Sequence, residues 1–186
     1  FMRPVLLSVL IVSVLIAPIA HSWSSLTPPP NVRITNIPQL NNEEQVWLCP
    51  TDSNIVIANW RDFRLGYRQV GVGRSTDGGA TWVDSLIPVG MQYYGDSAWQ
   101  SDPTLTVDRL GNFYMCVLDF VNSSNSASSI TFYNSYDKGV SWNGPFGFAT
   151  GIFDVFEDKQ FITIDRTGGA YDGRLYCSWT RFNNPD

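Results

Sequence analysis

The chain has 186 residues, of which 44% are apolar and 16% are charged, so its composition is that of a globular protein and not of a disordered or fibrous one. The net charge of −5 and the scattering of its 12 basic residues exclude a nucleic-acid-binding surface, which needs clustered Lys and Arg. Seven Trp, eight Tyr, eleven Phe and 15 Gly favour many short strands over helices, and we predict an all-β fold.

Residues 1–22 have the features of a secretory signal peptide. Met2 and Arg3 form a short basic start, the apolar run "VLLSVLIVSVLI" follows, and the small residues of "APIAHS" precede a cleavage position after Ser22. The alternative is a retained membrane anchor, although the apolar run is barely long enough for one and contains Pro18. Cleavage would leave the protein secreted or at the cell exterior, with no further membrane contact.

Residues 23–38 contain "SSLTPPP" and predict an extended Pro-rich spacer. After it, three segments repeat one pattern of two apolar runs joined by a turn: "EEQVWLCPTDSNIVIANWRDF", "QSDPTLTVDRLGNFYMCVLDF" and "EDKQFITIDRTGGAYDGRLYCSWTRF". In the first two repeats, two further strand-like runs flank a polar turn with the pattern Ser-x-Asp-x-Gly-x-x-Trp. The members of this pattern are Ser75, Asp77, Gly79 and Trp82 in the first copy and Ser135, Asp137, Gly139 and Trp142 in the second.

Four short strands in roughly sixty residues are the pattern of one β-propeller blade, a small sheet that cannot bury both of its faces alone. We therefore predict a β-propeller of four-stranded antiparallel blades over 39–186, with blade 1 at about 39–95, blade 2 at about 96–152 and blade 3 from about 153. Because the two turns are 60 residues apart, a third would begin near position 195, so blade 3 is incomplete. We expect the chain to be an N-terminal fragment of a longer propeller; the alternative is assembly with other chains.

The repeated turn has the composition of a structural hairpin. Its Asp can accept hydrogen bonds from the backbone of the turn, its Gly can adopt positive φ, and its Trp can pack beneath the turn. A calcium loop needs several oxygen ligands at alternating positions, which "DGGATW" and "DKGVSW" do not supply. The sequence therefore indicates no metal site and no cofactor.

The segments "STDGGATW" and "SYDKGVSW" resemble Asp-boxes, the bacterial neuraminidase repeats of sialidase-like six-bladed β-propellers. The segments "SDPTLTVDRLGNFY" and "DGRLYCSWT" are also similar to blade sequences of that superfamily, and the resemblance covers roughly residues 40–182. It implies about two and a half blades of a secreted propeller that acts on extracellular glycans or glycoconjugates. Two functions stay open: an exo-α-sialidase type of glycoside hydrolase, and a non-catalytic propeller that binds glycans or proteins.

The candidate site lies in the loops opposite the two turns, because alternating strand directions place the turns at one end of each blade and the longer loops at the other. By its place after the second strand, Asp62 resembles the general acid/base Asp of sialidases. The alternative is a solvated loop carboxylate. Asp119 and Arg181 occupy the place of Asp62 in the second and third repeats. The candidate substrate-binding residues are Arg61, Asp119, Arg181, Tyr93 and Tyr94.

The chain also departs from the sialidase pattern. Sialidase chemistry, as the resemblance implies it, uses three arginines that clamp the substrate carboxylate and a Tyr nucleophile activated by a Glu. Here the first inner strand begins with Glu43 and Glu44, which would repel a substrate carboxylate. The next two inner strands begin with Ser101-Asp102 and Glu157-Asp158. These acidic side chains could bind a cation, pair with Arg61 and Arg181, or remain solvated.

The three cysteines lie in apolar, strand-like runs at positions 49, 116 and 177. Their odd number and their surroundings predict three buried thiols. The alternative is one disulfide and one free thiol, which an exported protein could retain.

Overall fold

The computed structural model describes residues 30–93, 96–121, 127–151 and 155–183. The predicted signal peptide, residues 1–22, and the candidate residue Tyr94 lie outside the described residues. The described part is built from antiparallel strands, which confirms the all-β prediction. Within it, no helix is long and apolar enough to span a membrane.

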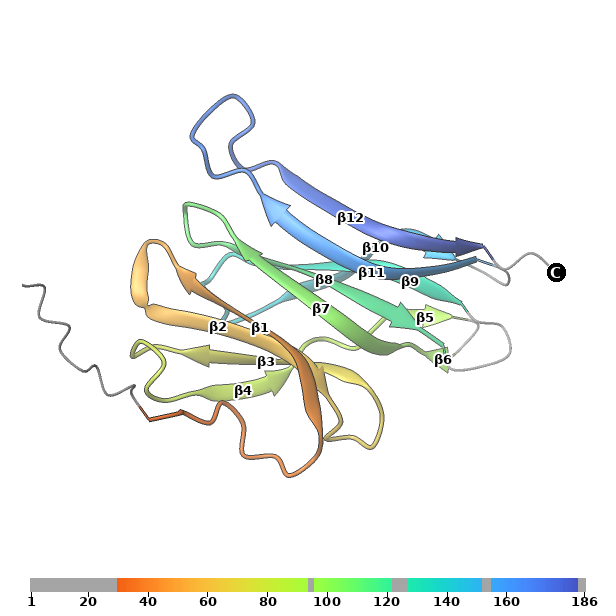
Figure 1. The fold of residues 1–186 in the computed structure, drawn as a ribbon, viewed down its shortest axis with the longest axis horizontal. Helices are drawn as coiled ribbons and strands as arrows, with labels where there is room; N and C mark the ends of the chain where they lie inside the picture. The colour runs from red at the N-terminus through yellow and green to blue at the C-terminus, as the bar shows by residue number, and fades with distance from the viewer. Residues whose placement is uncertain (1–29, 94–95, 122–126, 152–154, 184–186) are drawn as a thin grey trace, which may run out of the picture. The chain divides into compact units, whose positions relative to one another are not determined.

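The first sheet has four antiparallel strands in the order β1-β2-β3-β4 (Figure 1). They are β1 (Asn41–Cys49), β2 (Asp52–Asp62), β3 (Gln69–Ser75) and β4 (Val83–Leu86). Each strand is hydrogen-bonded to the next one along the chain, so the sheet is a simple meander of the kind that the first repeat predicts.

The second sheet repeats this meander with four strands of eight or nine residues each. They are β7 (Trp99–Val107), β8 (Phe113–Phe120), β9 (Ser128–Ser135) and β10 (Asn143–Gly151). The third repeat forms the hairpin of β11 (Val155–Ile164) and β12 (Leu175–Asn183). Along the chain between β4 and β7, a short ladder is formed by β5 (Gln92–Tyr93) and β6 (Asp96–Ser97), in a segment expected to be a loop.

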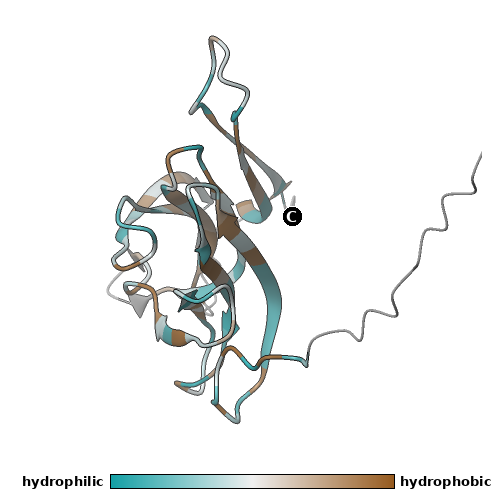
Figure 2. Ribbon diagram, turned by 90° about the vertical axis from the view of Figure 1, so that its left-hand side faces the viewer, coloured by the Kyte–Doolittle hydropathy of each residue, from teal (hydrophilic) through white to brown (hydrophobic). Residues whose placement is uncertain are grey.

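The hydrophobic core lies on both faces of the second sheet. On one face, Met115 and Val117 belong to a buried cluster with Ile57 of the first sheet. On the other face, Leu118 belongs to a cluster against which Ile162 of the hairpin packs. Because both faces are covered, residues 113–118 of β8 form a continuous apolar run and do not alternate between apolar and polar residues. Figure 2 shows such hydrophobic stretches along the central strands.

The first strands of the three repeats are neighbours, since β7 contacts both β1 and β11. In each four-stranded sheet the antiparallel order brings the first and third turns to one end. The opposite end contains the start of the first strand and the end of the second, where Asn41 pairs with Asp62 and Gln100 pairs with Asp119. We call this the loop end.

Part of the predicted spacer packs on the first sheet and is not a free linker. The compact unit begins at Val32. The Ile34 side chain lies so close to Gly73 that a Cβ at Gly73 would be 2.7 Å from it. Thr35 donates a hydrogen bond to Asp84 Oδ2 over 3.3 Å. The predicted spacer, residues 23–38, therefore ends before residue 38, because Ile34 packs against Gly73 of the first sheet.

Candidate functional site

Turn 1, residues 75–82, joins β3 to β4 and is closed by side chains that bond to its own backbone. Ser75 Oγ donates to Asp77 Oδ1 over 2.8 Å and accepts from the Gly79 N–H over 2.8 Å. Asp77 also accepts from the N–H of Thr81 (2.8 Å) and from its hydroxyl (2.6 Å). These bonds from Thr81 are the main reason that the pKa of Asp77 is lowered to about 2. The carboxylate therefore stays ionised at neutral pH and holds the turn.

Turn 2, residues 135–142, joins β9 to β10 and repeats the same bonds. Ser135 Oγ donates to Asp137 Oδ1 (2.8 Å) and accepts from the Gly139 N–H (2.8 Å). Ser141 takes the role of Thr81, with its N–H at 2.9 Å and its hydroxyl at 2.5 Å from the Asp137 carboxylate. The two turns thus share one structural arrangement, with the predicted Ser, Asp and Gly residues at its centre.

The two Trp side chains of these turns differ. Trp82 Nε1 donates to the carbonyl of Gly79 over 2.9 Å. Trp142 packs against the core between the first two sheets. Its Nε1 is buried and has no acceptor among the described residues. Trp142 therefore contributes to packing and, unlike Trp82, donates no hydrogen bond to a described residue.

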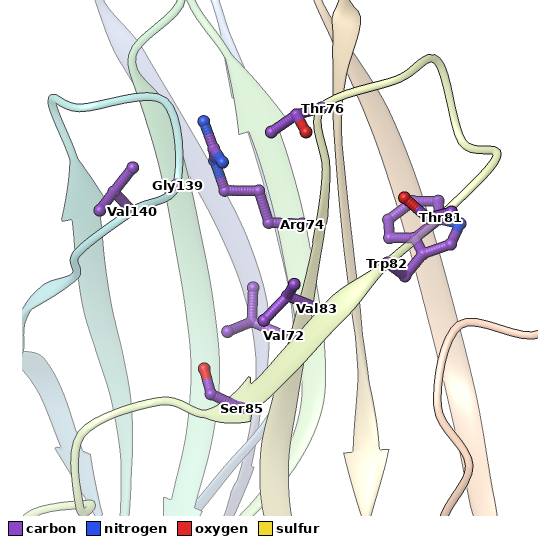
Figure 3. A pocket seen from close by; sticks show the side chains of 9 residues that line it. All are labelled: Val72, Arg74, Thr76, Thr81, Trp82, Val83, Ser85, Gly139 and Val140. Carbon is purple, nitrogen blue, oxygen red and sulfur yellow. The ribbon is translucent and has the colours of Figure 1, made fainter.

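A groove of about 260 Å³ lies between the two turns. Figure 3 shows Arg74 and Trp82 of the first sheet on one side of it, and Gly139 and Val140 of turn 2 on the other. Arg74 Nε donates to the carbonyl of Lys138 over 2.9 Å, so the guanidinium joins the two sheets. The groove is thus a joint between neighbouring sheets and has none of the predicted catalytic residues.

At the loop end, Asp62 is fully buried at the end of β2. It accepts hydrogen bonds from Trp60 Nε1 (2.8 Å), from the N–H of Arg64 (2.8 Å) and from the Arg64 guanidinium (2.8 and 3.1 Å). Burial alone would raise the pKa of Asp62, but the bonds from Arg64 and Trp60 outweigh it and lower the pKa below its ordinary value. Asp62 is therefore neither a solvated loop carboxylate nor a group that would hold a proton at neutral pH.

Asp119 occupies the matching position in the second sheet and has a different environment. It is also fully buried, and its Oδ2 accepts from the Met91 N–H over 2.9 Å. Gly90 covers the carboxyl group closely, because a Cβ there would lie 3.1 Å from Asp119 Oδ1. Burial raises the pKa of Asp119 to about 6. No basic side chain forms an ion pair with it in the described part of the chain.

Arg61 and Arg181 are both engaged with glutamates. Arg61 forms an ion pair with Glu43 (2.8 Å) and donates to Ser101 Oγ over 3.1 Å. Arg181 bonds through Nε to Glu157 over 2.7 Å, and the Glu157 side chain is fully buried. The acidic side chains at the strand starts were expected to bind a cation, pair with arginines or stay solvated. Glu43 and Glu157 are paired with arginines.

The candidate Tyr93 has no described contact with Asp62, Asp119, Arg61 or Arg181. Tyr93 lies in β5, and only its backbone is described. Among the described residues, no hydrogen bond or ion pair links Asp62, Asp119 and Arg181 to one another. Asp62, Asp119 and Arg181 thus occupy matching positions in three sheets and have no described bond to one another.

A second constellation lies on the first strands of the three repeats. Each of these strands has a β-bulge two residues after the position paired with Asp62, Asp119 or Arg181. The bulged residues adopt positive φ without being glycine: Glu43 (62°), Asp102 (50°) and Lys159 (53°). Such a conformation costs about 1–3 kcal/mol and is typical of functional sites. Positive φ at a residue other than glycine thus recurs at the equivalent bulge of all three strands.

The three bulges are hydrogen-bonded in series. Glu43 Oε2 accepts from the Asp102 N–H over 2.9 Å. Asp102 Oδ2 forms an ion pair with Lys159 Nζ over 2.6 Å, and Gln160 Nε2 donates to the Asp102 carbonyl. Burial would raise the pKa of Asp102, but the bonds from Lys159 and Ser101 lower it. The bulges therefore bring two carboxylates, Glu43 and Asp102, and one ammonium group, Lys159, to one place.

These bulges surround a pocket of about 170 Å³ that we call the bulge pocket. Gln160 and Thr104 line this pocket, and each has a buried polar atom without a partner among the described residues, Gln160 Oε1 and Thr104 Oγ1. Gln160 is only 1% exposed. Phe161, at the rim, is 61% exposed and offers an apolar ring face. Glu44 adds a further carboxylate to the lining.

The sequence analysis noted Glu43, Glu44 and Asp102 but missed Lys159, Gln160 and Thr104. One signal was available, because Pro103 interrupts a strand and proline in a strand interior marks a bulge or an edge. Lys159 and Gln160 interrupt the apolar run of β11 at the corresponding place. The pairing of Asp62 with Arg64 was missed because both belong to one short loop that the pattern treats as solvated.

No family model matches the sequence, and no curated protein matches it. The resemblance to sialidase-like propellers therefore depends on the residues of the chain, above all on turns 1 and 2. In the described ranges, no group of three or more His, Cys, Asp or Glu side chains is placed to hold a metal ion.

Proposed function

We propose that the chain forms part of a sialidase-like Asp-box β-propeller that binds extracellular glycans at its loop end. The propeller is supported by two meanders with matching turns and by the contacts of β1 and β11 with β7, as expected for inner strands around an axis. On this proposal the β11–β12 hairpin is the inner half of a third blade. The extracellular location depends on the predicted signal peptide.

The bulge pocket is the observation on which the binding function depends. Gln160 Oε1 can only accept hydrogen bonds, and Thr104 Oγ1 can donate or accept. A buried polar atom without a partner costs about 1–3 kcal/mol, so a ligand that satisfies both atoms recovers that energy. Sugar hydroxyls have both capacities, and Phe161 at the rim can pack against the apolar face of a sugar ring.

Binding is favoured over hydrolysis by the state of the predicted catalytic groups. Asp62 is bonded to Arg64 and has a lowered pKa, whereas a general acid needs a pKa near the working pH. Arg61 and Arg181 are already paired with glutamates and would have to give up these partners to clamp a substrate carboxylate. We therefore propose a non-catalytic binding propeller.

Hydrolysis is the second candidate, and one observation favours it. The pKa of Asp119 is raised to about 6, which suits a general acid in a glycosidase. Asp119 would then act in place of Asp62, and the loop with Gly90 and Met91 would have to open, because the carboxyl group is fully buried.

The protein expressed from its complete reading frame can be screened on a glycan array, beside turnover of a fluorogenic sialoside. We expect binding without turnover, and a loss of about five- to tenfold in affinity in Thr104→Val, which removes one hydrogen bond. Thr106→Val is the matched control, because Thr106 Oγ1 is equally buried and unpartnered but does not line the bulge pocket. Equal losses in both variants, or no glycan binding, would reject the proposal. Turnover that Asp119→Asn or Asp62→Asn abolishes would support hydrolysis instead.

A further inference from the structure

Two cysteines from distant parts of the sequence lie side by side between the second sheet and the hairpin. Cys116 is in β8 and Cys177 is in β12, and their Sγ atoms are 3.8 Å apart. All three cysteines are free in this structure. Cys49 and Cys116 are buried as predicted, whereas Cys177 is half-buried because β12 has no strand on its outer side among the described residues.

We propose that Cys116 and Cys177 are a redox pair that closes to an intramolecular disulfide by exchange with a small-molecule disulfide. A disulfide has an S–S distance of about 2.0 Å, so the sulfur atoms must approach by less than about 2 Å. Rotations of two side chains on packed strands can supply this movement. The proposal does not depend on glycan binding or on the propeller.

The surroundings of the two thiols give them different roles. Cys177 is partly accessible, and the hydrogen bond from Cys116 lowers the pKa of its thiol. Cys116 is fully buried, and its hydrogen bond to Cys177 and its burial raise the pKa of its thiol. The thiolate is the nucleophile in disulfide exchange, so Cys177 is the attacking residue and Cys116 the resolving one.

The exchange balances in two steps. The Cys177 thiolate attacks one sulfur of the small disulfide, which forms a mixed disulfide and releases one small thiolate. Cys116 then loses its proton and attacks Cys177 Sγ, which forms the protein disulfide and releases the second small thiolate. The protein thiols are oxidised by two electrons, and the small disulfide is reduced to two thiols.

Both cysteines line an apolar groove of about 340 Å³, with Phe132, Phe148 and Ile162 among its other lining residues. The groove gives a small disulfide a path to Cys177. The third cysteine cannot take part in this way, because Cys49 lies in β1 of another sheet, where its sulfur contacts Thr51 Oγ1 at 3.2 Å.

The test is to incubate the reduced chain with oxidised glutathione, unfold it, alkylate the remaining thiols and map the peptides by mass spectrometry. We expect the loss of two of the three alkylatable thiols and a peptide pair that joins Cys116 to Cys177. In Cys116→Ser, Cys177 should instead keep one glutathionyl group, because nothing resolves the mixed disulfide. In Cys177→Ser, Cys116 should remain a free thiol.

Cys49→Ser is the matched control and should form the disulfide as the unchanged chain does. The wild-type peptide map decides the question even where a variant does not fold. The proposal is overturned if the folded wild-type chain keeps three thiols, keeps a glutathionyl group on Cys177, forms a bond that includes Cys49, or joins two chains on a non-reducing gel.

Discussion

Replacing Asp119 by Asn should remove a pH dependence from the stability of the fold. The pKa of Asp119 is about 6 in the folded chain and about 3.9 in an unfolded one, a difference of about two pH units. Each unit is equivalent to about 1.4 kcal/mol, so ionisation of this group costs the folded state about 3 kcal/mol. Because the folded pKa is raised, the contribution of the protonated group is complete below pH 4 and is lost as the pH rises through 6.

The measurement is urea unfolding followed by Trp fluorescence at several pH values, for the wild-type chain and for Asp119→Asn. The wild-type free energy of unfolding should fall by about 3 kcal/mol relative to the variant between pH 4 and pH 7. The Asn side chain can still accept the Met91 N–H bond, and any constant difference between the two proteins does not alter this slope. A difference that stays flat from pH 4 to pH 7 would refute the argument from burial.

Asp62→Asn is the matched control at the equivalent position, and its sign is opposite. The folded pKa of Asp62 is lowered, so its stabilising contribution is present above the unfolded pKa and is lost as the pH falls through the folded pKa. At neutral pH the variant should be destabilised by about 3 kcal/mol, since it breaks a buried ion pair with Arg64. If the stability of both variants changed with pH in the same direction, the position in the strand, and not the surroundings, would determine the pKa of these carboxyl groups.

Three further predictions concern the turns and the thiols. Gly139→Ala should lower the urea midpoint more than Gly79→Ala. Both residues have positive φ, but only a Cβ at Gly139 would lie 2.3 Å from Ile57 Cδ1. The free energy of unfolding should therefore fall by about 1–3 kcal/mol more in Gly139→Ala. Trp82→Phe should lower the free energy of unfolding by about 1 kcal/mol through the loss of a hydrogen bond. Trp142→Phe should lack this contribution, because only Trp82 Nε1 has an acceptor. The proposed disulfide closes a loop of about 60 residues and should stabilise the oxidised chain by about 4 kcal/mol against the reduced chain, measured by thermal unfolding.

The features that sequence predicts well here are local ones. The hydrogen bonds of turn 1 connect residues within seven positions of one another, so the spacing of Ser75, Asp77 and Gly79 is sufficient to specify them. The alternation of apolar runs and turns likewise predicts the two meanders. Positive φ at Lys138 in turn 2, where turn 1 has Gly78, shows that the turn geometry persists even when the residue type changes.

The features that sequence does not predict depend on groups far along the chain. Burial raises the pKa of Asp119, and Gly90 and Met91, which contact its carboxyl group, lie about 30 residues earlier. The bulge pocket needs Asp102 and Lys159 to meet across 57 positions. No spacing rule within one repeat contains this information, because it arises only when the sheets pack against one another.

One buried carboxyl group occurs at the same level of all three sheets, and its partners decide its chemistry. Asp62 accepts a bond from the Trp60 indole, and Glu157 accepts one from Trp179, each over 2.8 Å. An arginine neutralises each of these two carboxylates.

In the second sheet the residue that matches Trp60 and Trp179 is Val117, which has no donor, and no arginine pairs with Asp119 in the described part of the chain. The indole and the guanidinium help to lower the pKa of Asp62, whereas Asp119 has neither partner and its burial raises its pKa to about 6. A role for a carboxylate therefore cannot be carried over from one repeat to the next by position. Of Asp62 and Asp119, it is Asp119 that the packing of the second sheet prepares to exchange a proton near neutral pH.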